Sequence, residues 1–257
     1  MNIIIKIFVL FNLILSISTI SSQEQNQEFY QIKIYSLETN EQAELTDHYL
    51  KEAYLPALKN QNISNIGVFK PRADSIKKIY LLIPFSSLAQ FETLEDELSK
   101  DETYLKNGSN YLKASYEKPT YQRIESVLLK AFSDMPKMQA TVLKGERKDR
   151  IYELRSYESP SETYFKNKVE MFNAGGEVKL FKQLGFNAVF YGEVISGPKM
   201  PNLMYMTTFS DMKSHDEHWD AFRAHPDWLK LKEVEKYKHT VSGSTKYLMH
   251  PTDYSDL

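Results

Sequence analysis

The chain repeats itself, and this internal repeat is the feature that most constrains its fold. The segment FYQIKIYSLET (Phe29–Thr39) matches IYELRSYESPS (Ile151–Ser161). Further along, Ile79–Leu105 matches Leu203–Leu229, and only a small insertion is needed to keep the two blocks in step. Self-similarity at a nearly fixed spacing indicates a duplicated structural unit. We therefore predict two copies of one small unit within a single chain.

Each copy is predicted to follow the order strand, helix, strand, strand, helix. The opening strand of each copy alternates between two residue sets with the period of two that is typical of a strand. Ser87 and Asp211 are predicted to cap helices, and Gly175-Gly176 is predicted either to interrupt a long helix or to let two backbones approach. The predicted elements are strands Tyr30–Leu37, Asn65–Phe69 and Lys78–Pro84 with helices Glu41–Lys59 and Ser87–Ser99 in the first copy, and strands Ile151–Tyr157, Asn187–Ile195, Leu203–Phe209 and Lys246–Met249 with helices Ser161–Leu184 and Asp211–Ala224 in the second.

The stretch between the copies is predicted to hold a helix and a linker. Apolar residues at Ile124, Val127, Leu128 and Phe132 follow a helical spacing within residues 119–132. The charged segment LKGERKDR that follows suits an exposed connection. We thus predict four parts: a signal peptide at 1–22, a first repeat at 28–118, a helix and linker at 119–149, and a second repeat at 150–251.

The order of elements predicts the fold class. A β-α-β-β-α-β unit is the ferredoxin-like plan, in which helices cover one face of an antiparallel sheet. The other, apolar face cannot remain exposed to water, and two such units can bury it by packing sheet to sheet. We expect an α+β protein whose two tandem ferredoxin-like repeats form an intramolecular barrel with helices outside. The chain would then be a pseudo-dimer by itself, and further association of chains stays open.

The first residues predict export. The segment MNIIIKIFVLFNLILSISTISSQ has one lysine near its start, an apolar run from Ile7 to Leu15, and then small polar residues. This pattern is typical of a signal peptide, and the apolar run is shorter than the roughly 20 residues of a spanning helix. We predict a periplasmic or secreted protein with no membrane span once the signal is removed.

Composition excludes several classes of function. The chain has no cysteine, so it can form neither disulfides nor thiolate metal sites, and it has no cysteine nucleophile. Its formal net charge is −2, so no strong positive field indicates nucleic acid as a partner.

The second copy resembles a known family. The segments RIYELRSYESPS, LFKQLGFNAVFYGEVISGPKMPNLMYMTTFSDM and HWDAFRAHPDW are similar to those of the NIPSNAP family, in which a strand opening Y-E-L-R-x-Y leads a dimeric α+β barrel. The resemblance covers Arg150–Pro251 and is weaker in the first copy, where Gln31 and Lys33 replace Glu and Arg. The two-repeat layout resembles exported bacterial proteins. The resemblance implies a fold that also includes haem-degrading monooxygenases and isomerases, and it implies no particular reaction.

The opening strands carry the first set of candidate site residues. Glu153, Arg155 and Tyr157 share one face of their strand, as Gln31, Lys33 and Tyr35 do in the first copy. We predict that this face looks into the barrel, with the Ile/Leu face under the helices. It would form either a structural ion-pair network or a lining in which Arg155 holds an anionic group and Glu153 orients the ligand or accepts a proton.

The segment SHDEHWDAFRAHPDW carries the second set. His215 and Trp219 fall on one helical stripe, with His218 beside them. The other copy has Phe91 and Leu94 in place of the two histidines, which favours a packed helix whose imidazoles are hydrogen-bonded internally. A metal or haem site is the alternative. The spacing of three residues and the lack of a third ligand argue against it, so no cofactor is expected.

Three functions remain open. The first is a binding protein that holds a small, partly apolar, anionic molecule between the two sheets, with Glu153, Arg155, Tyr157, Gln31, Lys33, Tyr35, His215, His218 and Trp219 as contact candidates. The second is an enzyme, a cofactor-poor or haem-linked oxygenase or an isomerase, with Glu153 or His218 as acid or base. The third is a structural or interaction module with a filled barrel.

Overall fold

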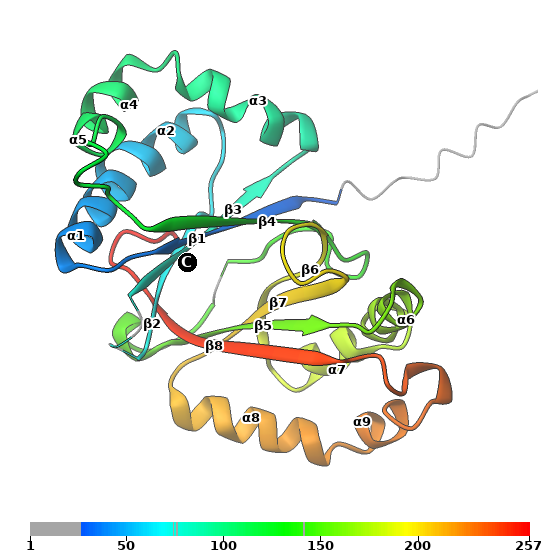
Figure 1. Cartoon of the computed structure of the whole chain (residues 1–257). Coiled ribbons are helices and arrows are strands. Elements are labelled where there is room, and N and C mark those ends of the chain that lie inside the picture. The colour runs from blue at the N-terminus through cyan, green and yellow to red at the C-terminus, as the bar shows by residue number, and fades with distance from the viewer. Residues whose placement is uncertain (1–26, 74, 76, 141) are drawn as a thin grey trace, which may run out of the picture.

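Eight strands close into one antiparallel barrel in the computed structural model, which describes residues 27–73, 75, 77–140 and 142–257 (Figure 1). The order around the barrel is β1-β3-β2-β8-β5-β7-β6-β4. The strands are β1 Phe29–Ser36, β2 Gly67–Pro71, β3 Lys78–Phe85, β4 Arg123–Ala131, β5 Ile151–Glu158, β6 Asn187–Ser196, β7 Asn202–Phe209 and β8 Gly243–Pro251. The predicted signal peptide lies outside the described residues.

The barrel is made of two sheets of four strands, one from each repeat. The first sheet has the order β4-β1-β3-β2 and the second the order β8-β5-β7-β6, which is the ferredoxin-like arrangement in both cases. Pairing of β2 with β8 and of β4 with β6 joins the sheets at both edges. Closure leaves no unpaired edge. The predicted single-chain α+β barrel of two repeats is therefore confirmed.

The helices lie outside the barrel, each set over its own sheet (Figure 1). The first repeat contributes α1 Asn40–Tyr49, a π-helical segment Leu50–Tyr54, α2 Leu55–Asn60, α3 Leu88–Leu98, α4 Glu102–Asn107 and α5 Ser109–Leu112. The second contributes α6 Glu162–Phe172, α7 Glu177–Gln183, α8 Met212–Ala224 and α9 Pro226–Leu231, and short 3-10 turns occur at Arg147–Asp149 and Glu235–Tyr237.

Local sequence signals account for several of these boundaries. The Ser87 side chain accepts a hydrogen bond from the Gln90 N–H, and Asp211 accepts one from the Ser214 N–H, so both predicted caps are confirmed. The predicted break between α6 and α7 occurs at Gly176, whose φ of 89° is in the left-handed region that favours glycine.

The helix predicted within residues 119–132 is wrong, because Arg123–Ala131 form strand β4. Val127, Leu129 and Ala131 are buried on the barrel side, which is the period of a strand. The apolar positions fit a helical spacing equally well, and pairing with β1 and β6 decides between the two. The first repeat therefore extends to Ala131, and the linker begins after it.

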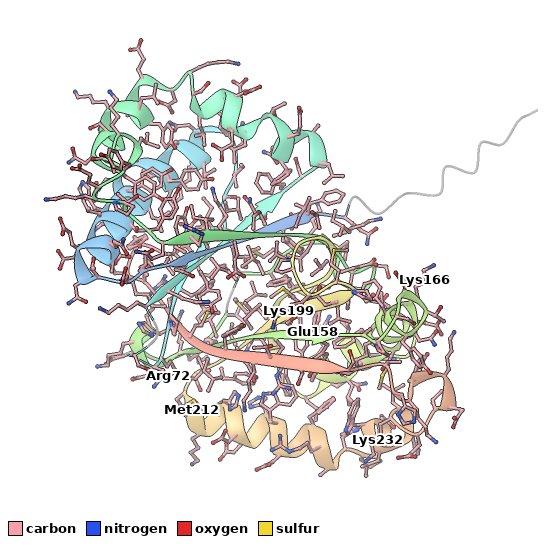
Figure 2. The ribbon with its side chains drawn as sticks, viewed as in Figure 1. Arg72, Glu158, Lys166, Lys199, Met212 and Lys232 are labelled. Carbon is pink, nitrogen blue, oxygen red and sulfur yellow. The ribbon has the colours of Figure 1, made fainter. Side chains whose placement is uncertain are left out.

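Three apolar cores stabilise the molecule. One lies beneath the helices of each repeat, and the third fills the barrel. Side chains from both sheets occupy the space between them (Figure 2). The third core contains Tyr30, Ile32, Ile34, Phe69, Tyr80, Leu82, Val127, Leu129, Ala131, Tyr152, Leu154, Val189, Phe190, Val194, Met204, Met206, Met249 and Leu257. A chamber for a ligand was predicted here, and the structure instead packs the barrel with side chains.

Candidate functional site

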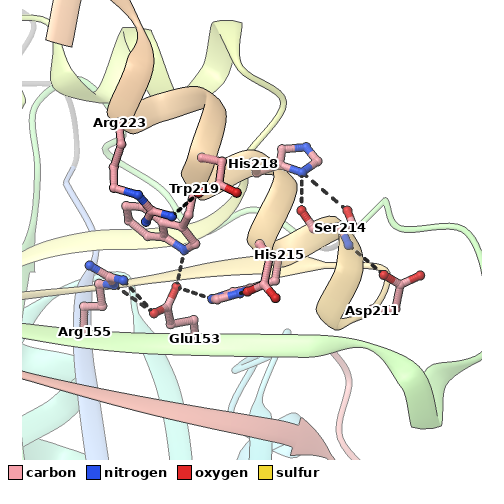
Figure 3. A network of polar contacts seen from close by, with 10 residues as sticks. Glu153, Arg155, Asp211, Ser214, His215, His218, Trp219 and Arg223 are labelled. Carbon is pink, nitrogen blue, oxygen red and sulfur yellow. Dashed lines mark hydrogen bonds and ion pairs between the residues drawn. The ribbon is translucent and has the colours of Figure 1, made fainter. Parts of the chain in front are cut away.

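The polar face of β5 lies against α8, on the outer side of the second sheet (Figure 3). The prediction that Glu153, Arg155 and Tyr157 look into the barrel is wrong. The barrel side of β5 carries Tyr152 and Leu154 instead. Both faces of a strand in this fold are buried, so alternation alone does not say which face meets the helices.

Glu153 is fully buried, and both of its oxygens contact donors. Its Oε1 accepts a hydrogen bond from Arg155 Nε at 2.9 Å and forms an ion pair with Arg155 Nη2 at 2.9 Å. Its Oε2 accepts from Trp219 Nε1 at 2.7 Å and from His215 Nε2 at 3.2 Å. Burial by itself would raise the pKa of Glu153, but the hydrogen bond from His215 and the charge of Arg155 outweigh it and hold the pKa below its ordinary value. Glu153 is therefore a buried carboxylate.

His215 lies between two carboxylates. Its Nε2 faces Glu153, and its Nδ1 is 2.8 Å from Asp216 Oδ1. A carboxylate can only accept, so both ring nitrogens must donate, which requires the imidazolium form. Burial lowers the pKa of His215, but hydrogen bonds to Glu153 and Asp216 outweigh that effect and raise it. A chain of contacts thus runs from exposed Asp216 to buried Glu153.

Arg155 is fixed on three sides. Its guanidinium lies 3.8 Å over the ring of Trp219, and its Nη1 donates to the Tyr157 hydroxyl at 3.0 Å. Tyr157 in turn is 3.0 Å from the Tyr205 hydroxyl. Burial would lower the pKa of Arg155, but the neighbouring Tyr205, Tyr157 and Glu153 raise it. The guanidinium is therefore charged and held in one orientation.

A second buried ion pair lies close by. Lys168 of α6 and Glu177 of α7 are 3.1 Å apart, with side chains 5% and 3% exposed. Lys168 Nζ also contacts Met171 Sδ at 3.3 Å. Burial raises the pKa of Glu177 although Lys168 opposes the rise. The break at Gly176 places this glutamate in the first turn of α7 and directs it back toward α6.

A cleft of about 310 Å³ connects the two ion pairs. It lies between the second sheet and its helices, and Arg223 and Val241 are exposed beside it. Its lining residues are Arg155, Tyr157, Lys168, Glu177, Trp219, Phe222, Arg223, Trp228, Val241 and Ser244. Three cations, of which Arg223 is exposed, a buried carboxylate and four aromatic rings therefore converge on one concave surface, which is the usual make-up of a small-molecule site.

The sequence named only part of this site. Arg155, Tyr157 and Trp219 were predicted as ligand contacts and line the cleft, with Glu153 directly behind them. Lys168, Glu177 and Trp228 were missed as contacts. Lys168 takes a place on the otherwise apolar stripe of α6, beside Phe165 and Phe172, and a lysine on such a stripe is the signal that could have found it.

The first-repeat candidates lie elsewhere. Gln31, Lys33 and Tyr35 occupy the helix side of the first sheet, so the structure does not bring them together with Glu153. Gln31 Nε2 donates to Ser126 Oγ at 2.8 Å. Lys33 Nζ is 3.3 Å from the Tyr54 hydroxyl and 3.8 Å from Glu95, and Tyr35 is 1% exposed. Gln31 is thus partnered by strand β4, and Lys33 by the helices of the first repeat.

His218 lies outside the cleft. It is half-buried on α8, its Nδ1 donates to the Ser214 carbonyl at 2.6 Å, and its ring packs edge-on against Phe186 and Phe209. The prediction that both histidines belong to a packed helix and are hydrogen-bonded internally is confirmed. Within the described part of the chain, no group of three or more His, Asp or Glu side chains could hold a metal ion.

Fold and cleft together define a single-chain barrel of the dimeric α+β class, with a helix–sheet cleft in its second repeat. Residues 152–256, which span β5 to β8, match the NIPSNAP family model. The first repeat lies outside this match. A comparison with curated proteins gave no significant match.

Solved structures with the same fold cover nearly the whole barrel. A proposed monooxygenase from Lactobacillus acidophilus matches with a TM-score of 0.56 and 10% identity, over 88% of this chain and 94% of its own. A second, from Fusobacterium nucleatum, has a TM-score of 0.57 and 9% identity over 88% and 92%. An anthrone oxidase-like protein has a TM-score of 0.52 and 11% identity over 89% and 92%. At identities this low, the structural similarity shows a shared fold and nothing further.

No helix among the described residues has both the length and the apolar character needed to cross a membrane.

Proposed function

We propose that the chain binds a small, partly apolar anion in the cleft of its second repeat. The observation that carries the proposal is the pair of cations, Arg155 and Lys168, on the walls of one cleft. This location replaces the barrel interior, whose side chains pack against one another.

Unused hydrogen-bond donors supply the anion contact. Arg155 has five N–H donors; its Nε donates to Glu153, its Nη1 donates to Tyr157, and its Nη2 forms an ion pair with Glu153 among the contacts of the described residues. Lys168 has three donors, and it donates to Glu177 and to the weakly accepting thioether of Met171. Charge-assisted hydrogen bonds to an anion are roughly twice as strong as neutral ones. The remaining donors of both cations therefore favour an anionic group in the cleft.

The two ion pairs pre-organise the cleft for this role. Glu153 holds Arg155 through a hydrogen bond and an ion pair and is itself held by Trp219 and His215. A cation fixed in this way loses little side-chain entropy when a ligand binds. The same residues then form the polar network and the ligand site. The β5 face can therefore be both a structural ion-pair network and a ligand lining.

Native mass spectrometry of the purified chain, with added benzoate as a probe, tests the proposal. Arg155→Met removes the charge at the cleft, and Lys33→Met is the matched change at the equivalent strand position of the first repeat. We expect the wild type and Lys33→Met to bind benzoate and Arg155→Met to lose it. Because Arg155→Met strands a buried carboxylate, the double variant Glu153→Gln/Arg155→Met is the folded reference. Equal binding by that folded double variant would contradict the proposal.

An enzyme is the second candidate function, and Glu177 favours it. This carboxyl lines the cleft, and its pKa is raised by burial, as is common for a general acid or base. Proteins of the same fold are named as proposed monooxygenases and an anthrone oxidase-like protein. Glu177, rather than Glu153 or His218, is then the residue to test, by Glu177→Gln in an assay of oxygen uptake with candidate phenols.

We also propose that the chain is exported, on the strength of the signal-peptide pattern of its first 22 residues. Fractionation of the host cell, followed by sequencing of the N-terminus of the purified protein, tests this. A product that begins at residue 1 would contradict it.

A further inference from the structure

The walls of the cleft form a continuous aromatic surface. Phe222 and Trp228 have ring centroids 4.5 Å apart at an interplanar angle of 35°. Phe222 and Trp219 are 5.6 Å apart at 84°. Tyr157 belongs to the same lining. A flat ring that enters the cleft therefore meets rings as its neighbours, and aromatic pairs gain energy beyond that of burial alone.

Two of the cations of the cleft, Arg155 and Lys168, are themselves placed over rings. Arg155 lies 3.8 Å over Trp219. Lys168 Nζ is 4.7 Å from the Phe172 centroid and 6.0 Å from that of Trp228. A guanidinium stacks on aromatic faces, and its planar fork matches a carboxylate. The same side chain can therefore receive both the acid group and the ring of one flat molecule.

Charge and size restrict the ligand further. The three cations of the lining, Arg155, Lys168 and Arg223, are each paired with a carboxylate, Glu153, Glu177 and Asp220 respectively. Because these charges balance, the cleft suits a single negative charge better than a phosphate dianion. The cleft volume of about 310 Å³ is roughly twice that of an engineered cavity of about 150 Å³ that accepts one benzene molecule. One or two rings therefore fit.

The first repeat has no counterpart of this surface. Glu95 aligns with Trp219 in the repeat and pairs with Lys33 at 3.8 Å. Tyr104 aligns with Trp228, is 6% exposed, and shares a hydrogen bond of 2.8 Å with Tyr49. Among the described residues, the matching place thus holds an exposed carboxylate and a packed tyrosine, and the aromatic cleft is a property of the second repeat.

We infer that the cleft selects planar aromatic monocarboxylates of one or two rings, with the carboxylate on Arg155 and the ring against Trp228. This inference rests on the proposed function. It adds that a flat, conjugated body is preferred over an aliphatic one of the same charge and size, and it names Trp228 as the residue that sets this preference.

The two tryptophans make the test specific. The chain has two tryptophans, and both line the cleft, so intrinsic tryptophan fluorescence reports on this site. The full chain is titrated with benzoate, with cyclohexanecarboxylate as the non-planar acid of equal charge, and with neutral benzamide. Calorimetry with the same three probes and with 2-naphthoate gives the dissociation constants independently. We expect benzoate to bind about tenfold more tightly than cyclohexanecarboxylate, and benzamide to bind more weakly than benzoate.

Variants at Trp228 assign the preference. Trp228→Leu should bring the constants for benzoate and cyclohexanecarboxylate together, whereas Trp228→Phe, which keeps a ring and leaves Trp219 as the fluorophore, should retain most of the difference. Equal constants for the two acids in the wild type would overturn this inference and leave the proposed function standing. Failure of every acid to bind by either method would overturn both. An unchanged preference in folded Trp228→Leu would overturn the role of Trp228.

Discussion

Glu153→Gln tests the buried network most directly. Glu153 is 0% exposed, accepts three hydrogen bonds, and forms an ion pair with Arg155. The variant removes its charge and leaves Arg155 without a counter-ion, while a glutamine offers one acceptor oxygen in place of two. Breaking a buried pair by removing one partner costs about 3–5 kcal/mol. For a chain of this length, each 1 kcal/mol lowers Tm by about 2–4 °C, so a fall in Tm of about 6–20 °C is expected.

Differential scanning calorimetry at pH 7 measures this effect. The matched control is Glu158→Gln on the same strand, because Glu158 is partly exposed and pairs at 3.2 Å with half-exposed Lys199 (Figure 2). Exposed pairs of this kind contribute about 0–1 kcal/mol, so Tm should fall by no more than about 4 °C. Equal Tm values for the two variants would refute the view that the Glu153 network stabilises the fold.

Three further predictions follow from neighbouring contacts. Since the pKa of His215 is raised in the folded state, its contribution to stability is fully present below its ordinary value of about 6.5 and is lost as the pH rises through its folded value. Urea denaturation should therefore show His215→Phe, which copies Phe91 of the first repeat, to be less stable than the wild type at pH 6, with the difference shrinking as the pH rises; a constant difference would contradict the imidazolium form. His218→Leu, which copies Leu94, should change the free energy of unfolding by less than about 1 kcal/mol in the same assay and leave benzoate binding intact, and a loss of binding at unchanged stability would instead place His218 in the site. Met206→Ala in the barrel core should destabilise the chain by about 2–5 kcal/mol with little effect on the dissociation constant of benzoate, whereas a ligand held in the barrel would show a large change in that constant.

The sequence was sufficient for the architecture because repetition and periodicity are local properties. The matched segments at Phe29 and Ile151 predicted two equivalent units, and β1 and β5 indeed pair with β3 and β7 in equivalent register, Phe29 opposite Phe85 and Ile151 opposite Phe209. Each ferredoxin-like sheet has one apolar face that no helix covers. Closure into a barrel buries both of these faces at once. The break at Gly176 needed only the conformational freedom of glycine.

Tertiary structure decided what the sequence left ambiguous. Residues 123–131 carry apolar side chains that suit either a helix or a strand, and the free edges of β1 and β6 select the strand. Glu153 and Arg155 share a face by alternation, but that face is buried whichever way it points. It meets α8 because Trp219 and His215 supply donors for the carboxylate there, while the barrel side offers apolar neighbours. The cleft brings Arg155 together with Lys168 and Glu177 only because α6 packs on β7 and α7 on β6 of the same sheet. Contacts between segments distant in sequence leave no local pattern from which to predict them.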